Sequence, residues 1–171
     1  MKVPEHKRPA STEMLEHEEG NPDYHLIFSL GPEYYAATLG SIREVIKWET
    51  VKPVPYMVPH FMGVINLRGQ LVSVVDLRSK FAITPAAGSP GLILVTERGE
   101  SLIGALVDDV HAVSRFSPSE IATTMALQTK VPIKFFCGIA KHGDHLVNVI
   151  DVAGSLSEEE FSTVKRSQES I

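Results

Sequence analysis

The sequence is poor in several features that define whole classes of protein. Among 171 residues there is one cysteine, Cys137, so no disulfide can form within the chain and a reducing compartment is expected. No stretch approaches the ~20 apolar residues that a membrane-spanning helix needs. The polar N-terminus also lacks the apolar core of a secretion signal. These absences predict a cytoplasmic protein with no direct membrane insertion.

Positive charge is scarce as well. Lysine and arginine together number 16 against 21 aspartates and glutamates, which leaves a formal net charge of −5. A general nucleic-acid binder needs a basic surface that displaces counterions from phosphates. The clusters of basic residues are limited to Lys7-Arg8 and Lys165-Arg166. The composition therefore argues against nucleic acid as a partner.

The motifs of catalysis are missing or incomplete. There is neither a G-x-S-x-G elbow nor an H-E-x-x-H pair. Gly138 and Gly143 have the spacing of a phosphate loop, but no Lys-Ser/Thr follows them. His142, His145 and Cys137 could ligate a metal, yet three residues along one hairpin rarely close a site. We therefore predict no enzyme activity, no metal and no cofactor, with the two histidines facing solvent.

Two further candidates for chemistry have simpler structural interpretations. Asp108 and Asp109 are adjacent on an expected strand, so their side chains point to opposite faces and form a charged strand edge rather than a catalytic pair. Cys137 follows two phenylalanines and has no cationic neighbour, which favours a small core residue over a nucleophile.

What the chain does contain is a series of strand-like segments. Residues 1–22 are polar with three prolines, which predicts a flexible arm. From Tyr24 onward, β-branched and aromatic runs alternate with glycine-containing turns, as in β-hairpins. The expected hairpins are 24–39, 61–77, 91–116 and 135–152.

Two helical segments are expected besides the hairpins. Ile42, Val45 and Ile46 follow Ser41 with the i, i+3, i+4 spacing of a helix, which predicts a short helical turn. A C-terminal helix is expected over about 157–168, because its start combines a capping box with a hydrophobic staple. The residues of these two motifs are Ser157 with Glu160, and Leu156 with Phe161.

The sequence also repeats itself. The aligned segments are 63–77 with 138–152, and 36–45 with 104–113. Both matches need no gap and keep the same order in each half, which indicates a duplicated β module. A sheet of about five strands closes into a barrel to hide its edges, and a unit of ~60 residues is marginal alone. We therefore predict an all-β chain with a first barrel at about 23–86 and a second at about 90–152, packed against each other.

The stretch GVINLRGQLVSVVDLRSKF, from Gly63 to Phe81, resembles the signature of the CheW family, the adaptor proteins of bacterial chemotaxis. The family pattern is a glycine, then N-L-R-G, a strand, and D-L-R with a phenylalanine shortly after. All of these are present, although Ser73 stands where a proline is common. The resemblance covers nearly everything but the arm and the extreme tail, and gives an expected domain of 23–161.

The resemblance implies a fold and a function. The family fold is two five-stranded SH3-like barrels related by a pseudo-twofold axis. The implied function is a non-catalytic scaffold that binds a chemoreceptor's cytoplasmic hairpin tip and the regulatory domain of a histidine kinase. Such a scaffold is cytoplasmic, is recruited to membrane receptor arrays, and serves chemotaxis or a related motility pathway. A small ligand-binding module, or an enzyme acting in the cleft between the barrels, is the alternative.

The resemblance also names candidate site residues. Arg68 lies at an expected hairpin tip, where its charge stays in water. Spacing alone favours a solvated turn arginine with no partner role, worth ~0–1 kcal/mol as a surface pair. The resemblance instead implies that Arg68 pairs with Glu44 beside the cleft between the barrels. Ile42, Val110 and Val113 match positions implicated in receptor contact, where exposed aliphatic side chains would receive a helix face. For Val113, packing in the inter-barrel core is an equally good interpretation.

Two glycines are expected to be structural turn residues. Gly69 supplies the positive φ of a tight turn, and Gly63 opens the signature. The kinase-binding surface is expected on the first barrel, with its residues unknown.

Overall fold

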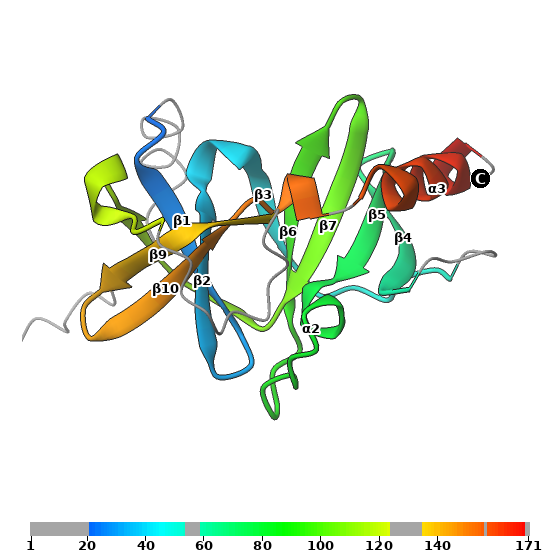
Figure 1. Cartoon of the computed structure of the whole chain (residues 1–171). Helices are drawn as coiled ribbons and strands as arrows, with labels where there is room; N and C mark the ends of the chain where they lie inside the picture. Colours follow the sequence, from blue (N-terminus) through cyan, green and yellow to red (C-terminus); the bar gives the residue numbers. More distant parts are fainter. Residues whose placement is uncertain (1–20, 54–58, 124–134, 156, 170–171) are drawn as a thin grey trace, which may run out of the picture.

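The structure, a computed structural model, describes residues 21–53, 59–123, 135–155 and 157–169. The expected N-terminal arm therefore lies almost wholly outside the described residues. In the described part of the chain, ten strands form two five-stranded sheets (Figure 1). The strands are β1 (Tyr24–Leu30), β2 (Glu33–Thr38), β3 (Ile42–Lys47), β4 (Phe61–Leu67), β5 (Gln70–Asp76), β6 (Leu92–Arg98), β7 (Ser101–Val107), β8 (Asp109–Arg115), β9 (Phe136–His142) and β10 (His145–Ile150).

The helices are few and mostly short. They are η1 (Leu39–Ser41), α2 (Leu77–Lys80), η2 (Pro118–Glu120), η4 (Ala153–Ser155) and α3 (Glu158–Glu169). Among the helices of the described residues, only α3 has more than one turn, and it lies beside β4 and β5 at one end of the molecule (Figure 1). None of the described helices is long and apolar enough to cross a bilayer. The all-β class and the C-terminal helix are as predicted.

Each sheet combines hairpins with one parallel junction. Sheet A has the order β8-β1-β2-β10-β9, and sheet B has the order β3-β6-β7-β5-β4. Neighbouring strands are antiparallel except for β2 with β10 and β5 with β7, which are parallel. The end strands of sheet A are β8 and β9, and the end strands of sheet B are β3 and β4.

The two sheets do not coincide with the two halves of the sequence. The chain leaves sheet A after β2, builds β3 to β7 in sheet B, and returns to sheet A for β8 to β10. The predicted barrels at 23–86 and 90–152 are therefore wrong in composition, since each half supplies two strands to one sheet and three to the other. Hairpin patterns identify strands that pair locally, but they do not say which distant strand completes the sheet.

The duplication itself is confirmed by the topology. If β1 to β5 are the counterparts of β6 to β10 in the same order, replacing every strand of sheet A by its counterpart gives the strand order of sheet B. Fine detail is duplicated too. Arg43 and His111, which align in the repeat, are both bulged out of register in their strands. The isolated bridges Lys52–Val64 and Ala122–Ile139 also occupy equivalent places.

Two local predictions fail at the crossovers between the sheets. The segment after Ser41 is strand β3, paired with β6, and not a helical turn. Its β-branched residues fit a strand, and pairing with β6 overrides the i, i+3, i+4 spacing. The long second arm of the hairpin over 91–116 is also broken. It divides at Asp108 into β7, in sheet B, and β8, in sheet A.

A single apolar core joins the sheets. This seam core combines side chains from both sheets and from the segments that follow β5 and β10. Its members are Leu26, Phe28, Leu30, Tyr35, Ala37, Leu39, Ile42, Leu77, Phe81, Ile83, Leu94, Ala105, Val107, Phe135, Ile150 and Val152. Separate clusters fill sheet A around Val147 and sheet B around Val72, two residues that align in the repeat. The shared interface expected between the two units is therefore present.

Candidate interaction site

Arg68 stands at the tip of the hairpin between β4 and β5. The two-residue turn has φ of +50° at Arg68 and +85° at Gly69, the sign that tight hairpin turns of this length demand. The Asn66 side chain closes the turn by accepting a hydrogen bond from the Gly69 N–H at 2.8 Å. The positive φ predicted for Gly69 is confirmed. The turn holds the Arg68 side chain 71% exposed, so its charge is solvated.

The predicted pair between Arg68 and Glu44 is present. An Arg68 Nη2 donates to Glu44 Oε1, and the Glu44 side chain is 24% exposed. Glu44 lies on β3 and Arg68 follows β4, so the contact links the two end strands of sheet B. A pair this exposed adds only about 0–1 kcal/mol to stability. Its main effect is to orient the guanidinium.

Gly63 lies inside β4 and not in a turn, which corrects its expected role. The register of β4 with β5 shifts between Phe61 and Gly63, and the φ of Gly63 is +138°. A Cβ on Gly63 would come within 2.2 Å of the Lys52 carbonyl oxygen. Gly138, its partner in the repeat, has φ of +155° and meets the Ala122 carbonyl in the same way. Close backbone approach therefore requires glycine here.

The three aliphatic candidates are less accessible than expected. Ile42 is only 7% exposed and belongs to the seam core, while Val110 and Val113 are partly buried against it. The core-packing interpretation given for Val113 thus describes all three. Two large aliphatic side chains that were not among the candidates are exposed, Val45 on β3 at 40% and Leu146 on β10 at 68%, and Val45 lies next to Glu44 in the sequence. The alignment of Val45 with Val113 in the repeat was the signal that could have found it.

A buried charge network lies behind the signature hairpin, and sequence reasoning missed it. Asp76 caps α2 by accepting from the Arg78 and Ser79 N–H groups at 3.0 and 3.4 Å. The Arg78 guanidinium contacts Asp76 at 3.1 Å and Asp108 at 2.9 Å. Burial alone lowers the pKa of Arg78, but its hydrogen bonds to Asp76 and Asp108 outweigh burial and raise it. Arg78 is therefore firmly cationic.

Two chemical candidates are placed differently from the sequence interpretation. Asp108 is 3% exposed at a crossover between sheets, so the charged strand edge is wrong for this residue. Cys137 is exposed and not a core residue, because its strand β9 ends sheet A. Partial burial and the nearby Asp151 carboxylate raise the pKa of the Cys137 thiol, which disfavours the nucleophilic thiolate.

One histidine of the β9–β10 hairpin, His145, packs on an aromatic ring. His145 is exposed, and its ring centroid lies 4.6 Å from that of Tyr34. The ring centroid of His111, on β8, lies 5.2 Å from the same Tyr34 centroid. Within the described ranges, no group of three or more histidine, cysteine, aspartate or glutamate side chains could hold a metal ion.

The model of the CheW-like domain matches residues 25–160 of this sequence. The chain belongs to the CheW-like family. The chemotaxis protein CheW of Klebsiella aerogenes is 27% identical over 140 residues, which cover 81% of this chain and 84% of the relative. CheW of Bacillus subtilis is 28% identical over 139 residues, with 78% and 86% covered. The crystal structure of the scaffolding protein TtCheW from Thermoanaerobacter tengcongensis superposes with a TM-score of 0.73, 26% identity, and coverage of 93% of this chain and 96% of that one.

Within this CheW-like fold, most signature residues have a structural task. Gly63 permits close backbone approach, Asn66 and Gly69 form the turn, and Asp76 with Arg78 builds the buried network. Arg68 differs, because its charge faces water and, among the residues that the structure describes, its ion pair is the exposed one with Glu44. It is the signature charge that a partner can reach.

Proposed function

We propose that this CheW-like chain is a non-catalytic scaffold that couples chemoreceptors to a histidine kinase, in chemotaxis or a related motility pathway. Its relatives are chemotaxis proteins named CheW, and the superposed crystal structure is that of a scaffolding protein. The observation that carries the proposal is Arg68, a signature cation that the turn presents to solvent. Stability does not account for it, since an exposed pair contributes so little.

The proposed receptor surface is centred on Arg68 and Glu44. The occupant is the helical hairpin at the cytoplasmic tip of a chemoreceptor. Val110 and Val113 are only partly buried against the seam core, and their exposed parts supply the apolar edge of the surface. Ile42 is buried in the seam core, so it affects the proposed surface indirectly, through its packing. The regulatory domain of the kinase takes a second surface, so that the cytoplasmic scaffold is recruited to membrane receptor arrays.

The alternative, a ligand-binding module or an enzyme acting between the two units, has no observation in its favour. The seam is filled by apolar side chains from both sheets, of which Phe28, Tyr35 and Phe81 are among the largest. A ligand site of that kind needs an open concave pocket with converging polar groups.

Reversing the charge of Arg68 tests the proposal. Arg68→Glu places two carboxylates together at the proposed surface, so co-sedimentation with receptor-containing membranes and the kinase should weaken about tenfold or more. The circular dichroism melt should stay nearly unchanged, because the side chain is exposed. Arg43→Glu is the matched control, since Arg43 is another exposed arginine of sheet B in an ion pair, with Glu97. Unchanged co-sedimentation of folded Arg68→Glu would count against the proposal, and loss of the fold would make Arg68 a structural residue.

A further inference from the structure

One buried carboxylate ties together segments that are far apart in the sequence. Asp108 Oδ1 accepts from Arg78 at 2.9 Å, and Oδ2 accepts from the N–H groups of Gly31 at 2.5 Å and Ala86 at 3.2 Å. The Asp108 N–H donates to the Ser29 carbonyl at 3.0 Å. Asp108 thereby holds the chain where it crosses from sheet B to sheet A.

These bonds span the two sheets. Gly31 lies in the turn between β1 and β2, which belong to sheet A, whereas Arg78 lies in α2, which directly follows β5 of sheet B. Asp76 fixes the guanidinium from its other side. Because the Asp108 and Arg78 side chains are 1% and 11% exposed, removing either partner leaves the other charge poorly solvated.

The internal repeat shows that this arrangement exists on one side only. The chain also crosses between the sheets from β2 to β3. In the repeat, Gly40 at this crossover aligns with Asp108 at the β7–β8 crossover, and Ala153 aligns with Arg78. Glycine and alanine cannot form an ion pair. Asp151, the counterpart of Asp76, accepts instead from the Gly154 N–H at 3.0 Å. The two crossovers are thus equivalent in topology and different in how they are held.

We propose that the Arg78–Asp108 pair is a one-sided clamp that sets the angle between the two sheets. The seam is held rigid at the Asp108 crossover and yields first at the opposite crossover, around Gly40. This device belongs to the fold and does not depend on which partners bind. Its consequence for a scaffold is that the surfaces on sheets A and B keep a defined relative orientation.

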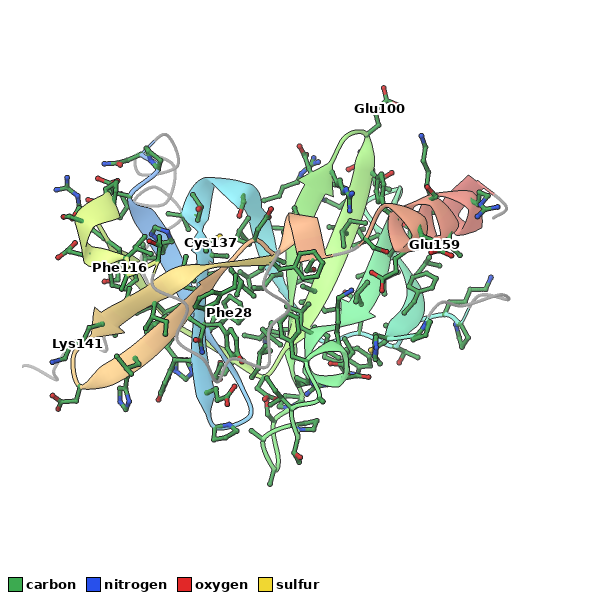
Figure 2. All side chains as sticks on the ribbon, in the orientation of Figure 1. Phe28, Glu100, Phe116, Cys137, Lys141 and Glu159 are labelled. Atoms are coloured by element: carbon green, nitrogen blue, oxygen red, sulfur yellow. The ribbon has the colours of Figure 1, made fainter. Side chains whose placement is uncertain are left out.

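The angle between the sheets can be measured with two spin labels. Glu100, at the β6–β7 turn of sheet B, and Lys141, on β9 of sheet A, are exposed and stand far apart (Figure 2). Both would be changed to cysteine in a Cys137→Ser background, and the interlabel distance distribution recorded by double electron–electron resonance. We expect a narrow single distribution for the otherwise unaltered protein.

Releasing the clamp should widen that distribution. Asp108→Asn removes the charge, and Arg78→Lys keeps a cation but loses the planar fork that reaches two carboxylates. Each should broaden the distribution by a factor of about 2, while Glu97→Gln, which breaks an exposed pair next to the Gly40 crossover, should not. A folded Arg78→Lys protein with an unchanged distribution overturns the proposal, as does equal broadening by Glu97→Gln.

Hydrogen exchange on the unmutated protein gives a test that needs no variant to fold. The Asp108 N–H bonds the Ser29 carbonyl at the clamped crossover, and the Ile42 N–H bonds the Leu39 carbonyl at the other. The Asp108 amide should exchange at least about tenfold more slowly, because opening starts at the Gly40 side. Equal protection, or faster exchange at Asp108, contradicts a one-sided clamp.

Discussion

Gly63 and Gly69 are both glycines for reasons of conformation, but only one of them is also constrained by its surroundings. At Gly69 a Cβ would meet no atom within 4 Å, so the requirement is the φ of +85° alone. At Gly63 the Cβ would collide with the Lys52 carbonyl in addition to an unfavourable φ. Replacing each glycine by alanine should therefore lower the free energy of unfolding by a different amount.

We expect Gly63→Ala to lower the free energy of unfolding by about 3 kcal/mol, because the β4 backbone must move away from residue 52. Gly69→Ala should cost about 1 kcal/mol, the strain of a left-handed alanine in an open turn. Urea denaturation followed by circular dichroism measures both. Equal losses would mean that the contact with Lys52 relaxes freely.

At the scale of elements, α3 shows how a local signal and a tertiary contact combine. The predicted capping box is confirmed. The Ser157 N–H donates to Glu160 at 2.9 Å, and the Glu160 N–H donates to the Ser157 hydroxyl at 3.1 Å. The staple partner Leu156 lies outside the described residues. Docking uses Phe161, which packs on a buried cluster of sheet B and lies under the Arg98 guanidinium at 4.2 Å.

Acid should loosen this helix from sheet B. Partial burial raises the pKa of Glu160, but hydrogen bonds from Lys80 and from the Ser157 N–H outweigh it, so the pKa lies below the ordinary 4.5. A lowered folded-state pKa contributes stability above the unfolded value, and that stability disappears as pH falls from 4.5 through the folded value. Glu160→Gln should therefore be less stable than the unaltered protein at neutral pH, with the difference shrinking below pH 4.5.

Urea titrations at several pH values measure this difference in the free energy of unfolding. Glu159→Gln serves as the control, because Glu159 is exposed on the same turn of α3 (Figure 2). A Glu160→Gln deficit that is the same at about pH 3 and about pH 7 would refute the role of the Lys80–Glu160 pair.

The exchange of strands between halves governs the whole molecule. Sheet A takes β1 and β2 from the first half and β8 to β10 from the second, so neither half contains a complete sheet. Within each half the paired strands are two separate hairpins, because β3 pairs with β6 and β8 pairs with β1. An isolated two-stranded hairpin is marginal in water. Folding of this chain therefore requires contacts between residues far apart in sequence.

A chain divided at Gly88 should show this dependence. Gly88 is exposed in the linker before β6, and a Cβ there would touch nothing, so a break leaves the packing intact. We expect residues 1–88 and 89–171 to be unfolded when separate and to recover the circular dichroism spectrum of the intact protein when mixed. A cooperative thermal transition in either fragment alone would show that the halves are independent units.

Several features of the fold and the site are predictable from the residues. The strands follow from β-branched runs, the Arg68-Gly69 turn from its glycine, and the duplication from ungapped alignment, because each leaves a local pattern in the sequence. The Glu44–Arg68 pair came from the family resemblance and is present. The burial of Ile42 was not predictable, since the i, i+3, i+4 spacing suits a helical turn as well as a bulged strand.

The sequence by itself determined the class of fold, the family signature and the exposed cation at the hairpin tip, since short-range backbone preferences and turn geometry are local. Only the tertiary structure decided which strands share a sheet and how the crossovers are held. Pairing between distant strands, and the convergence of Asp76, Arg78 and Asp108, depend on where the chain returns in space. No periodic pattern in the sequence indicates where the chain comes back to pair with a distant strand.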